Sequence, residues 1–111
     1  MKLAPDPKAE RWLLGLTGAA EEFDWDAGNL SKNSKHGVEP HDIQALIVGD
    51  FYFAGRIVEP AHEEPRWLAL GEDGAGRRLA LVFTRRGERL RPISCRAMRR
   101  KEKLLYEQVR L

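Results

Sequence analysis

The sequence predicts an α+β fold in which an antiparallel β-sheet packs against N-terminal helices and a C-terminal helix. Aromatic and β-branched residues predict a strand at residues 51–58, an alternating pattern predicts one at 66–71, and an apolar run at 79–84 followed by a return segment at 89–96 predicts a pair of strands. Apolar residues three or four positions apart predict helices at residues 5–16, 40–48 and 97–109, and capping residues predict a further helix at 27–36. Because short loops join the strands, we expect an antiparallel meander covered on one face by helices.

The clearest predicted element is a β-hairpin, with Gly87 in the turn between its strands, where it can adopt a positive φ. From Arg77 to Arg110 the chain has twelve Lys and Arg but three acids, a net charge of +9, whereas the whole chain carries only +2. A basic block on an ordered hairpin and helix predicts a polyanionic ligand, either nucleic acid or an acidic protein. For any single arginine, the alternative is a solvated position that keeps a small domain soluble.

Capping residues delimit the predicted N-terminal helices. Two prolines open the first helix, which ends at Gly15 or Gly18. Residues 22–25 alternate between polar and apolar, which predicts a short strand. Asp26 is suited to cap the next helix and Gly37 to end it.

Spacing predicts which side chains each later helix exposes. The helix over 27–36 should present one polar and basic face, made by Asn29, Lys32, Asn33 and His36. The helix over 40–48 should bury Ile43, Leu46 and Ile47. The last helix should bury a stripe of Met98, Leu105 and Val109 and expose Arg99, Lys103 and Arg110.

Length and composition exclude several classes of protein. A chain of 111 residues, 42% hydrophobic and 32% charged, is expected to form one globular domain. No apolar run is long enough to cross a bilayer, and residues 1–20 lack a signal-peptide pattern, so we expect a cytoplasmic protein with no membrane partner. Cys95 is the only cysteine, and its place on a predicted strand favours a small core residue over a nucleophile. The three histidines fit no local metal-ligand spacing, so no metal or other cofactor is expected.

Several motifs follow one another along most of the chain. The first is Phe23-Asp24-Trp25-Asp26-Ala27-Gly28-Asn29, followed by Lys32 and Lys35-His36-Gly37-Val38. Further segments are Glu59 to Arg66, Leu70-Gly71, Gly76-Arg77, Phe83-Thr84, Arg91 to Met98, Lys101-Glu102 and Tyr106-Glu107. In their order and spacing, from about Phe23 to Glu107, these motifs resemble the BrnT family of bacterial toxins. The resemblance divides the chain into an N-terminal helical extension, residues 1–22, and a BrnT-like toxin domain, residues 23–111. Cys95 stands where the family usually has alanine.

The resemblance implies a compact RelE-like fold and the toxin component of a type II toxin–antitoxin system. Such a toxin is an endoribonuclease, a hydrolase that cleaves RNA and thereby inhibits translation. A cognate BrnA-like antitoxin neutralises it, and operator DNA is bound only through that antitoxin. Expected partners are therefore the antitoxin and the RNA substrate.

RNA cleavage without a metal needs a base near the 2′-oxygen, an acid near the leaving 5′-oxygen, and cations near the phosphate. Arginine offers a planar fork of donors for two phosphate oxygens. The candidate catalytic residues are His36, Arg66, Arg78, Arg91, Arg96 and Glu102. The candidate RNA-binding residues are Lys32, Lys35, Arg99 and Tyr106.

Several of these residues have a structural alternative. His36 can transfer protons near neutral pH or simply cap a helix end, whereas His41 and His62 are expected to be structural or surface residues. Glu102 can reach Arg99 or an arginine of the sheet, so it either holds a phosphate-binding arginine or acts as a general base. Trp25, Trp67 and Phe83 can stack on bases, but aromatic residues on strands are more often core residues.

Three functions of different classes are compatible with these observations. One is the metal-independent endoribonuclease toxin. Another is a nucleic-acid-binding module without catalysis, which would show a steep salt dependence and leave RNA intact. The last is a protein-interaction domain whose basic surface meets an acidic antitoxin segment.

Overall fold

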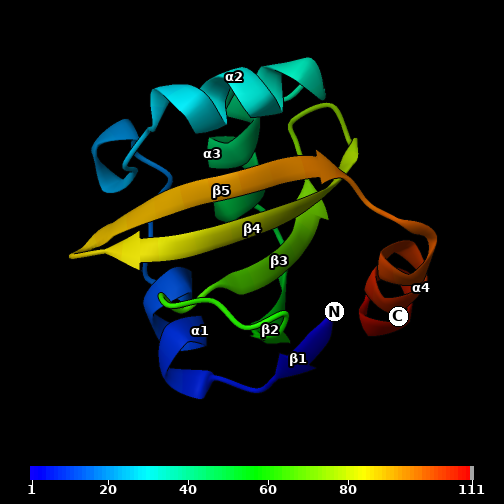
Figure 1. Ribbon diagram of the computed structural model, residues 1–111. Helices are drawn as coiled ribbons and strands as arrows, with labels where there is room; N and C mark the ends of the chain where they lie inside the picture. Colours follow the sequence, from blue (N-terminus) through cyan, green and yellow to red (C-terminus); the bar gives the residue numbers. More distant parts are fainter. Residues whose placement is uncertain (111) are drawn as a thin grey trace.

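The computed structural model describes residues 1–110 and has an α+β architecture (Figure 1). The elements in chain order are β1 (Lys2–Ala4), α1 (Pro7–Leu14), the 3-10 helix η1 (Ala20–Glu22), α2 (Ala27–Lys35), α3 (Pro40–Val48), β2 (Tyr52–Glu59), β3 (Trp67–Glu72), β4 (Arg78–Arg86), β5 (Arg89–Ala97) and α4 (Arg100–Val109). The five strands form one antiparallel sheet in the order β1-β2-β3-β4-β5. The predicted fold class and meander are therefore confirmed, and β1 is an additional strand.

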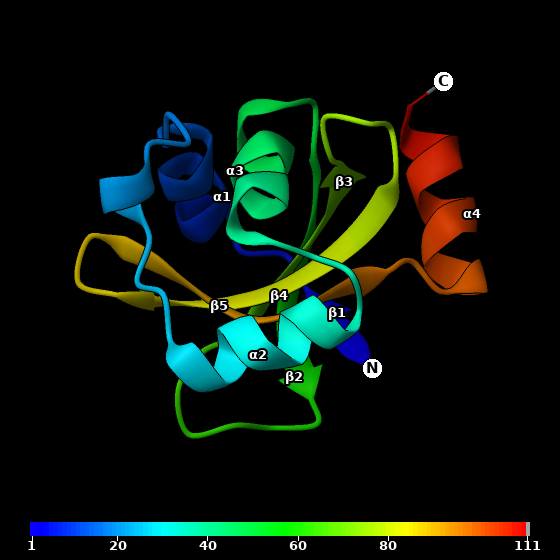
Figure 2. The ribbon, with the colours of Figure 1, turned by 90° about the horizontal axis from the view of Figure 1, so that it is seen from above.

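The hairpin is confirmed, but its turn is shorter than the predicted one of residues 85–88, because β4 continues to Arg86. Arg86 pairs with Arg89, so the turn consists of two residues, and Gly87 adopts a φ of +62°. A left-handed residue in a two-residue turn matches the twist of the flanking strands, which is why glycine is favoured there. The hairpin tip lies at one end of the sheet and α4 at the other (Figures 1 and 2).

Helices cover both faces of the sheet, so the prediction of a single covered face is wrong. Alternation along β3 sends Trp67 and Ala69 into the larger core beneath α1, α2 and α3. Leu68 and Leu70 enter a smaller core beneath α4, where Tyr106 is 1% exposed. A strand buried on both faces shows a continuous apolar run instead of an alternating one.

Capping explains where the N-terminal helices begin and end. The Asp26 carboxylate accepts a hydrogen bond from the Asn29 N–H at 3.1 Å, and Gly37 has a φ of +73° after the end of α2. The Asp6 carboxylate caps α1 through the Ala9 N–H and also accepts the indole N–H of Trp67 at 2.8 Å. This second contact attaches α1 to the sheet. Residues 1–14 thus contribute a strand, a helix and buried Leu13 to the same sheet and core as the rest of the chain.

Three local predictions are wrong for tertiary reasons. Residues 22–25 form no strand, because this segment makes only one isolated bridge, from Phe23 to Leu90 beside the edge of β5. Asn33 is not on a solvated face: it is 2% exposed, and its Oδ1 accepts the Cys95 N–H at 2.9 Å along that edge. In α4, Tyr106 takes the buried position expected for Val109, which is 43% exposed.

Candidate nucleic-acid interface

Most arginines of the basic block are already paired with carboxylates. Seven of its twelve cations form an ion pair within residues 1–110; they are Arg77, Arg78, Arg85, Arg86, Arg91, Arg96 and Arg110. Several of the partner acids, such as Asp26 and Glu64, come from the acidic first part of the chain. Folding therefore neutralises much of the charge separation that is visible in the sequence.

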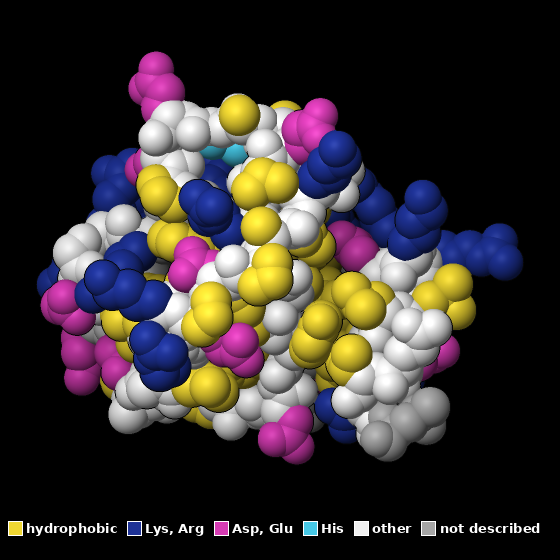
Figure 3. Space-filling model, turned by 90° about the horizontal axis from the view of Figure 1, so that it is seen from below, with side chains coloured by type: hydrophobic (Ala, Val, Ile, Leu, Met, Phe, Trp, Pro, Cys, Tyr) yellow, Lys and Arg dark blue, Asp and Glu magenta, His cyan; other side chains and the backbone are white. Residues whose placement is uncertain are grey.

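The cations without an ion pair are concentrated at the start of α4. Arg99, Arg100, Lys101 and Lys103 form no ion pair among the described residues, and all four are exposed. Figure 3 shows Lys and Arg side chains grouped at this end of α4, next to an apolar area. This group, residues 99–103, is the part of the basic block that is best placed to attract a polyanion.

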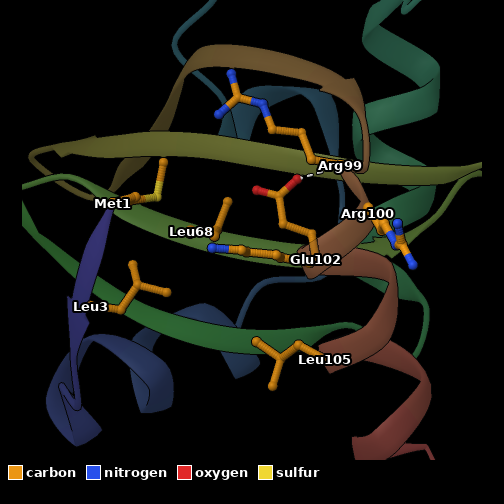
Figure 4. A pocket seen from close by; sticks show the side chains of 8 residues that line it. Met1, Leu3, Leu68, Arg99, Arg100, Glu102 and Leu105 are labelled. Carbon is orange, nitrogen blue, oxygen red and sulfur yellow. Dashed lines mark hydrogen bonds between the residues drawn. The ribbon is translucent and has the colours of Figure 1, made fainter.

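A cleft of about 430 Å³ lies beside this group (Figure 4). It is lined by Met1, Leu3, Leu68, Arg99, Arg100, Lys101, Glu102 and Leu105. Its walls thus come from β1, β3 and the first turns of α4, three elements that are distant in sequence. Apolar side chains form one part of the lining and cationic side chains the other.

Arg96 is fixed next to this cleft by Glu102. Its Nη1 donates to Glu102 Oε1 at 2.7 Å and its Nη2 to Oε2 at 3.0 Å, and both side chains are about 15% exposed or less. Glu102 also accepts the backbone N–H of Arg99 at 2.7 Å. The carboxylate therefore orients the guanidinium and caps α4 at the same time.

This environment decides the charge of Glu102. Burial by itself raises the pKa of the carboxyl, but the hydrogen bonds from Arg96 and from the Arg99 N–H outweigh it, so the pKa lies below its ordinary value. A carboxylate that is stabilised in this way is ionised at neutral pH and is a weak base. The geometry favours a role in holding Arg96 over a role in proton abstraction.

The other predicted arginines lie apart from this pair. Arg91 pairs in register with Thr84 near the hairpin turn, whereas Arg96 pairs with Ala80, five residues further along β5 and about 15 Å away at the rise of a strand. The Arg91 guanidinium contacts Asp26 at 2.8 Å and Asp24 at 3.6 Å. Arg66, directly before β3, is half-buried, and its Nε has no hydrogen-bond partner within residues 1–110.

Arg78 and Tyr106 form part of the packing of α4. Arg78 contacts Glu107 at 2.6 Å and lies over the Tyr106 ring at 5.7 Å. The buried Tyr106 hydroxyl donates to Glu72 at 2.9 Å, and its pKa is raised by burial and by this acceptor. A phenol held in this way attaches α4 to the sheet and leaves no ring face exposed for a base.

The candidates on α2 form a separate group. Lys32, Lys35 and His36 are all exposed, and His36 is the C-cap residue of α2. α2 follows the outer edge of β5, as the Asn33 contact shows (Figure 2). Within residues 1–110, the His36 side chain forms no hydrogen bond or ion pair with Arg96 or Glu102. His41 and His62 are exposed as well.

Three further findings concern the cysteine thiol, metal ligands and membrane-spanning helices. Burial raises the pKa of the Cys95 thiol to about 12, so the thiol is neutral, and the side chain lies in the larger core as predicted. No three His, Cys, Asp or Glu side chains of residues 1–110 are grouped so that they could hold a metal ion. No helix in the same part of the chain has the length and apolarity to span a bilayer.

Of the eight residues that line the cleft, sequence reasoning named only Arg99 and Glu102 as site residues. Arg100 and Lys101 belong to a run of three basic residues after β5, and that run is a usable signal. Met1 and Leu3 had no such signal, because a strand of three residues is too short to show a period.

An α+β domain with a rigidly held arginine and unpaired cations beside a cleft has the features of a protein that binds a polyanion. Comparison with known families identifies the family: a family model described as the ribonuclease toxin BrnT of a type II toxin–antitoxin system matches residues 25–102. The chain therefore belongs to the BrnT family. Membership implies an antitoxin partner. The resemblance read from the sequence motifs is thereby confirmed.

A solved structure is also similar to the chain. It is the crystal structure of the Brucella abortus ribonuclease toxin BrnT, with 23% sequence identity and a TM-score of 0.48. The similarity covers 70% of this chain and 96% of that chain. No curated protein matches the sequence.

Proposed function

We propose that this chain is a metal-independent endoribonuclease that cleaves RNA, arrests translation and is neutralised by a cognate antitoxin. The observation that supports this best is the Arg96–Glu102 pair next to the cations of residues 99–103. A guanidinium that is held in place by a carboxylate needs no reorganisation when charge builds on a phosphate. The proposal assigns the chemistry to these side chains and to no metal ion.

In the proposed reaction, the 2′-hydroxyl of one ribose attacks the adjacent phosphorus and the bond from phosphorus to the 5′-oxygen breaks. A base takes the 2′-hydroxyl proton, and an acid supplies a proton to the leaving 5′-oxygen. The products are a 2′,3′-cyclic phosphate and a 5′-hydroxyl. Arg96 stabilises the charge on the phosphorane, because its Nε and one Nη2 hydrogen are not used by Glu102 or by the Ala97 carbonyl.

The remaining candidates take secondary roles. Arg99 contacts the RNA backbone at the start of α4, and Lys32 and Lys35 attract it from α2. His36 is the candidate for proton transfer, since an imidazole can both accept and donate a proton near neutral pH. Arg66, which directly precedes β3, and Arg78, which contacts α4, are assigned to positioning these two elements around the site.

The test is to express the chain alone and with the gene next to it, and then to map RNA ends. We expect growth arrest and new ends with a 2′,3′-cyclic phosphate, relieved by the neighbouring gene product. Purified protein should cleave RNA equally well in EDTA. Arg96→Ala should lower the cleavage rate about 100-fold or more, as loss of a single charge-stabilising donor does in other enzymes.

The control for this variant is Arg89→Ala, which removes an exposed hairpin arginine that forms no ion pair within residues 1–110. It should cleave RNA at the unchanged rate. Equal cleavage by Arg96→Ala and the parent chain would remove Arg96 from the site. Tight RNA binding with intact ends after long incubation would instead identify a non-catalytic binding module.

A further inference from the structure

The N-terminal strand forms one wall of the cleft, although it lies outside the segment matched by the family model, residues 25–102. β1 pairs antiparallel with β2, with Leu3 opposite Ile57, and this pairing places Met1 and Leu3 at the cleft. Figure 4 shows these two side chains across from Glu102 and Leu105 of α4. The wall therefore exists only because residues 2–4 extend the sheet.

The lining has two chemical parts. Met1, Leu3, Leu68 and Leu105 provide apolar surface, and Arg99, Arg100 and Lys101 provide three positive charges. A nucleotide has the matching two parts, a flat base with apolar faces and anionic phosphates. The volume of about 430 Å³ lies within the range of small-molecule sites, so the hollow suits one nucleotide unit better than an extended segment of polypeptide.

The position of the cleft connects it to the proposed chemistry. Glu102 lines the cleft and also holds Arg96, so a base seated in the cleft would lie within a few ångströms of that pair. Its phosphates would meet residues 99–101 at the rim. The apolar surface that packs on a base would contribute specificity. The cations that contact its phosphates would contribute affinity.

We propose that this cleft binds one nucleobase of the RNA substrate, with the flanking phosphates on Arg99, Arg100 and Lys101, and that Leu3 is a specificity-determining residue. The proposal rests on the proposed ribonuclease function for the identity of its ligand. It goes beyond that function by assigning base selection to a strand that precedes the family-matched segment.

The experiment titrates the whole chain with the four ribonucleoside 3′,5′-bisphosphates and follows backbone amide signals by NMR. We expect the Leu3, Leu68 and Leu105 signals to shift, with dissociation constants that differ at least threefold among the four bases. Leu3→Trp fills the cleft and should weaken binding at least tenfold. Lys2→Ala is the matched control on the same strand, because Lys2 pairs with Glu59 at 3.3 Å and does not line the cleft.

A second variant covers the case in which Leu3→Trp fails to fold, as judged by circular dichroism. Leu105→Trp fills the same space from α4 and should give the same loss of binding. Shifts confined to other parts of the chain, or tight binding by a folded cleft-filling variant, would overturn the proposal. So would a cleft whose signals respond to the co-expressed antitoxin and to none of the four nucleotides.

The two proposals can fail separately. A parent chain that cleaves RNA, while the bisphosphates leave the cleft signals unchanged, keeps the ribonuclease function and overturns the base site. A chain that binds the bisphosphates in the cleft but leaves RNA intact supports the base site and overturns the ribonuclease function. In a cleaving chain, Leu3→Ala should alter the distribution of bases at the cut sites, and Lys2→Ala should not.

Discussion

The hairpin tip and the start of α4 are both rich in cations, but they differ in what surrounds those cations. In the hairpin, Arg85 and Arg86 are paired with Glu88 and Glu64. At the start of α4, Arg99, Arg100 and Lys101 have no such partner within residues 1–110 and border a cleft. We therefore expect a basic stretch of sequence to form a binding surface only where the fold leaves its charges unpaired.

The largest expected effect comes from removing the unpaired charges. The triple variant Arg99→Ala, Arg100→Ala, Lys101→Ala should bind RNA about 100-fold more weakly at low salt. The slope of log affinity against log salt concentration should become shallower by about 2, because each of the three lost contacts with single-stranded RNA contributes about 0.7 to its magnitude. Fluorescence anisotropy at several salt concentrations measures both quantities.

The matched control removes three cations from the hairpin: Arg85→Ala, Arg86→Ala, Arg89→Ala. It changes the net charge by the same amount, so its slope should stay within about 0.5 of the parent chain's. Equal losses in the two triple variants would show that charge alone, without its location, governs binding.

The next effect is on stability, at the partner of Arg96. Glu102→Gln should lower the free energy of unfolding by about 2 kcal/mol at neutral pH, because it removes charged hydrogen bonds at a side chain that is 13% exposed. The folded-state pKa of Glu102 lies below the unfolded value. Its contribution is therefore complete above the unfolded pKa and is lost as pH falls through the folded pKa. Urea unfolding at a series of pH values should show parent and variant converging in acid.

A smaller effect is expected at Arg91, which contacts Asp24 and Asp26 and is 21% exposed. Arg91→Ala should cost about 1 kcal/mol, since the acidic partners are about one-third exposed and partly solvated. Urea unfolding measures this cost, and Asp26 should still cap α2. The slope of log RNA affinity against log salt concentration should equal that of the parent chain. A slope that is shallower by about 0.7 would show that Arg91 contacts a phosphate.

The smallest effect is expected at Arg86, whose guanidinium contacts Glu64 at 3.3 Å with 47% of the side chain exposed. Arg86→Ala should change the free energy of unfolding by less than about 0.5 kcal/mol, because water screens an exposed pair. Thermal and urea unfolding should overlay the parent curves. A loss above 1 kcal/mol would show that the hairpin cations carry more of the stability than their exposure indicates.

Local signals predicted most of the elements. Asp26 and Gly37 delimit α2 through hydrogen bonds and backbone geometry that involve only near neighbours. The hairpin was predictable for the same reason, since Gly87 alone permits its turn. Glu102 could be expected to reach an arginine of the sheet because β5 and α4 adjoin in sequence. Long-range contacts were not predictable in this way: the buried Asn33 side chain accepts a hydrogen bond from the Cys95 N–H, 62 residues away.

The family, the α+β class, the hairpin and most helix ends could be predicted from the sequence, because they depend on motifs and on interactions a few residues long. The last helix begins at Arg100 and not at residue 97, because β5 continues to Ala97. The unpaired cations, the burial of Tyr106 and the cleft between β1 and α4 could not be predicted, because an ion pair or a cleft depends on which distant segments come into contact. The packing of both faces of the sheet sets these long-range contacts, so local sequence patterns do not predict them.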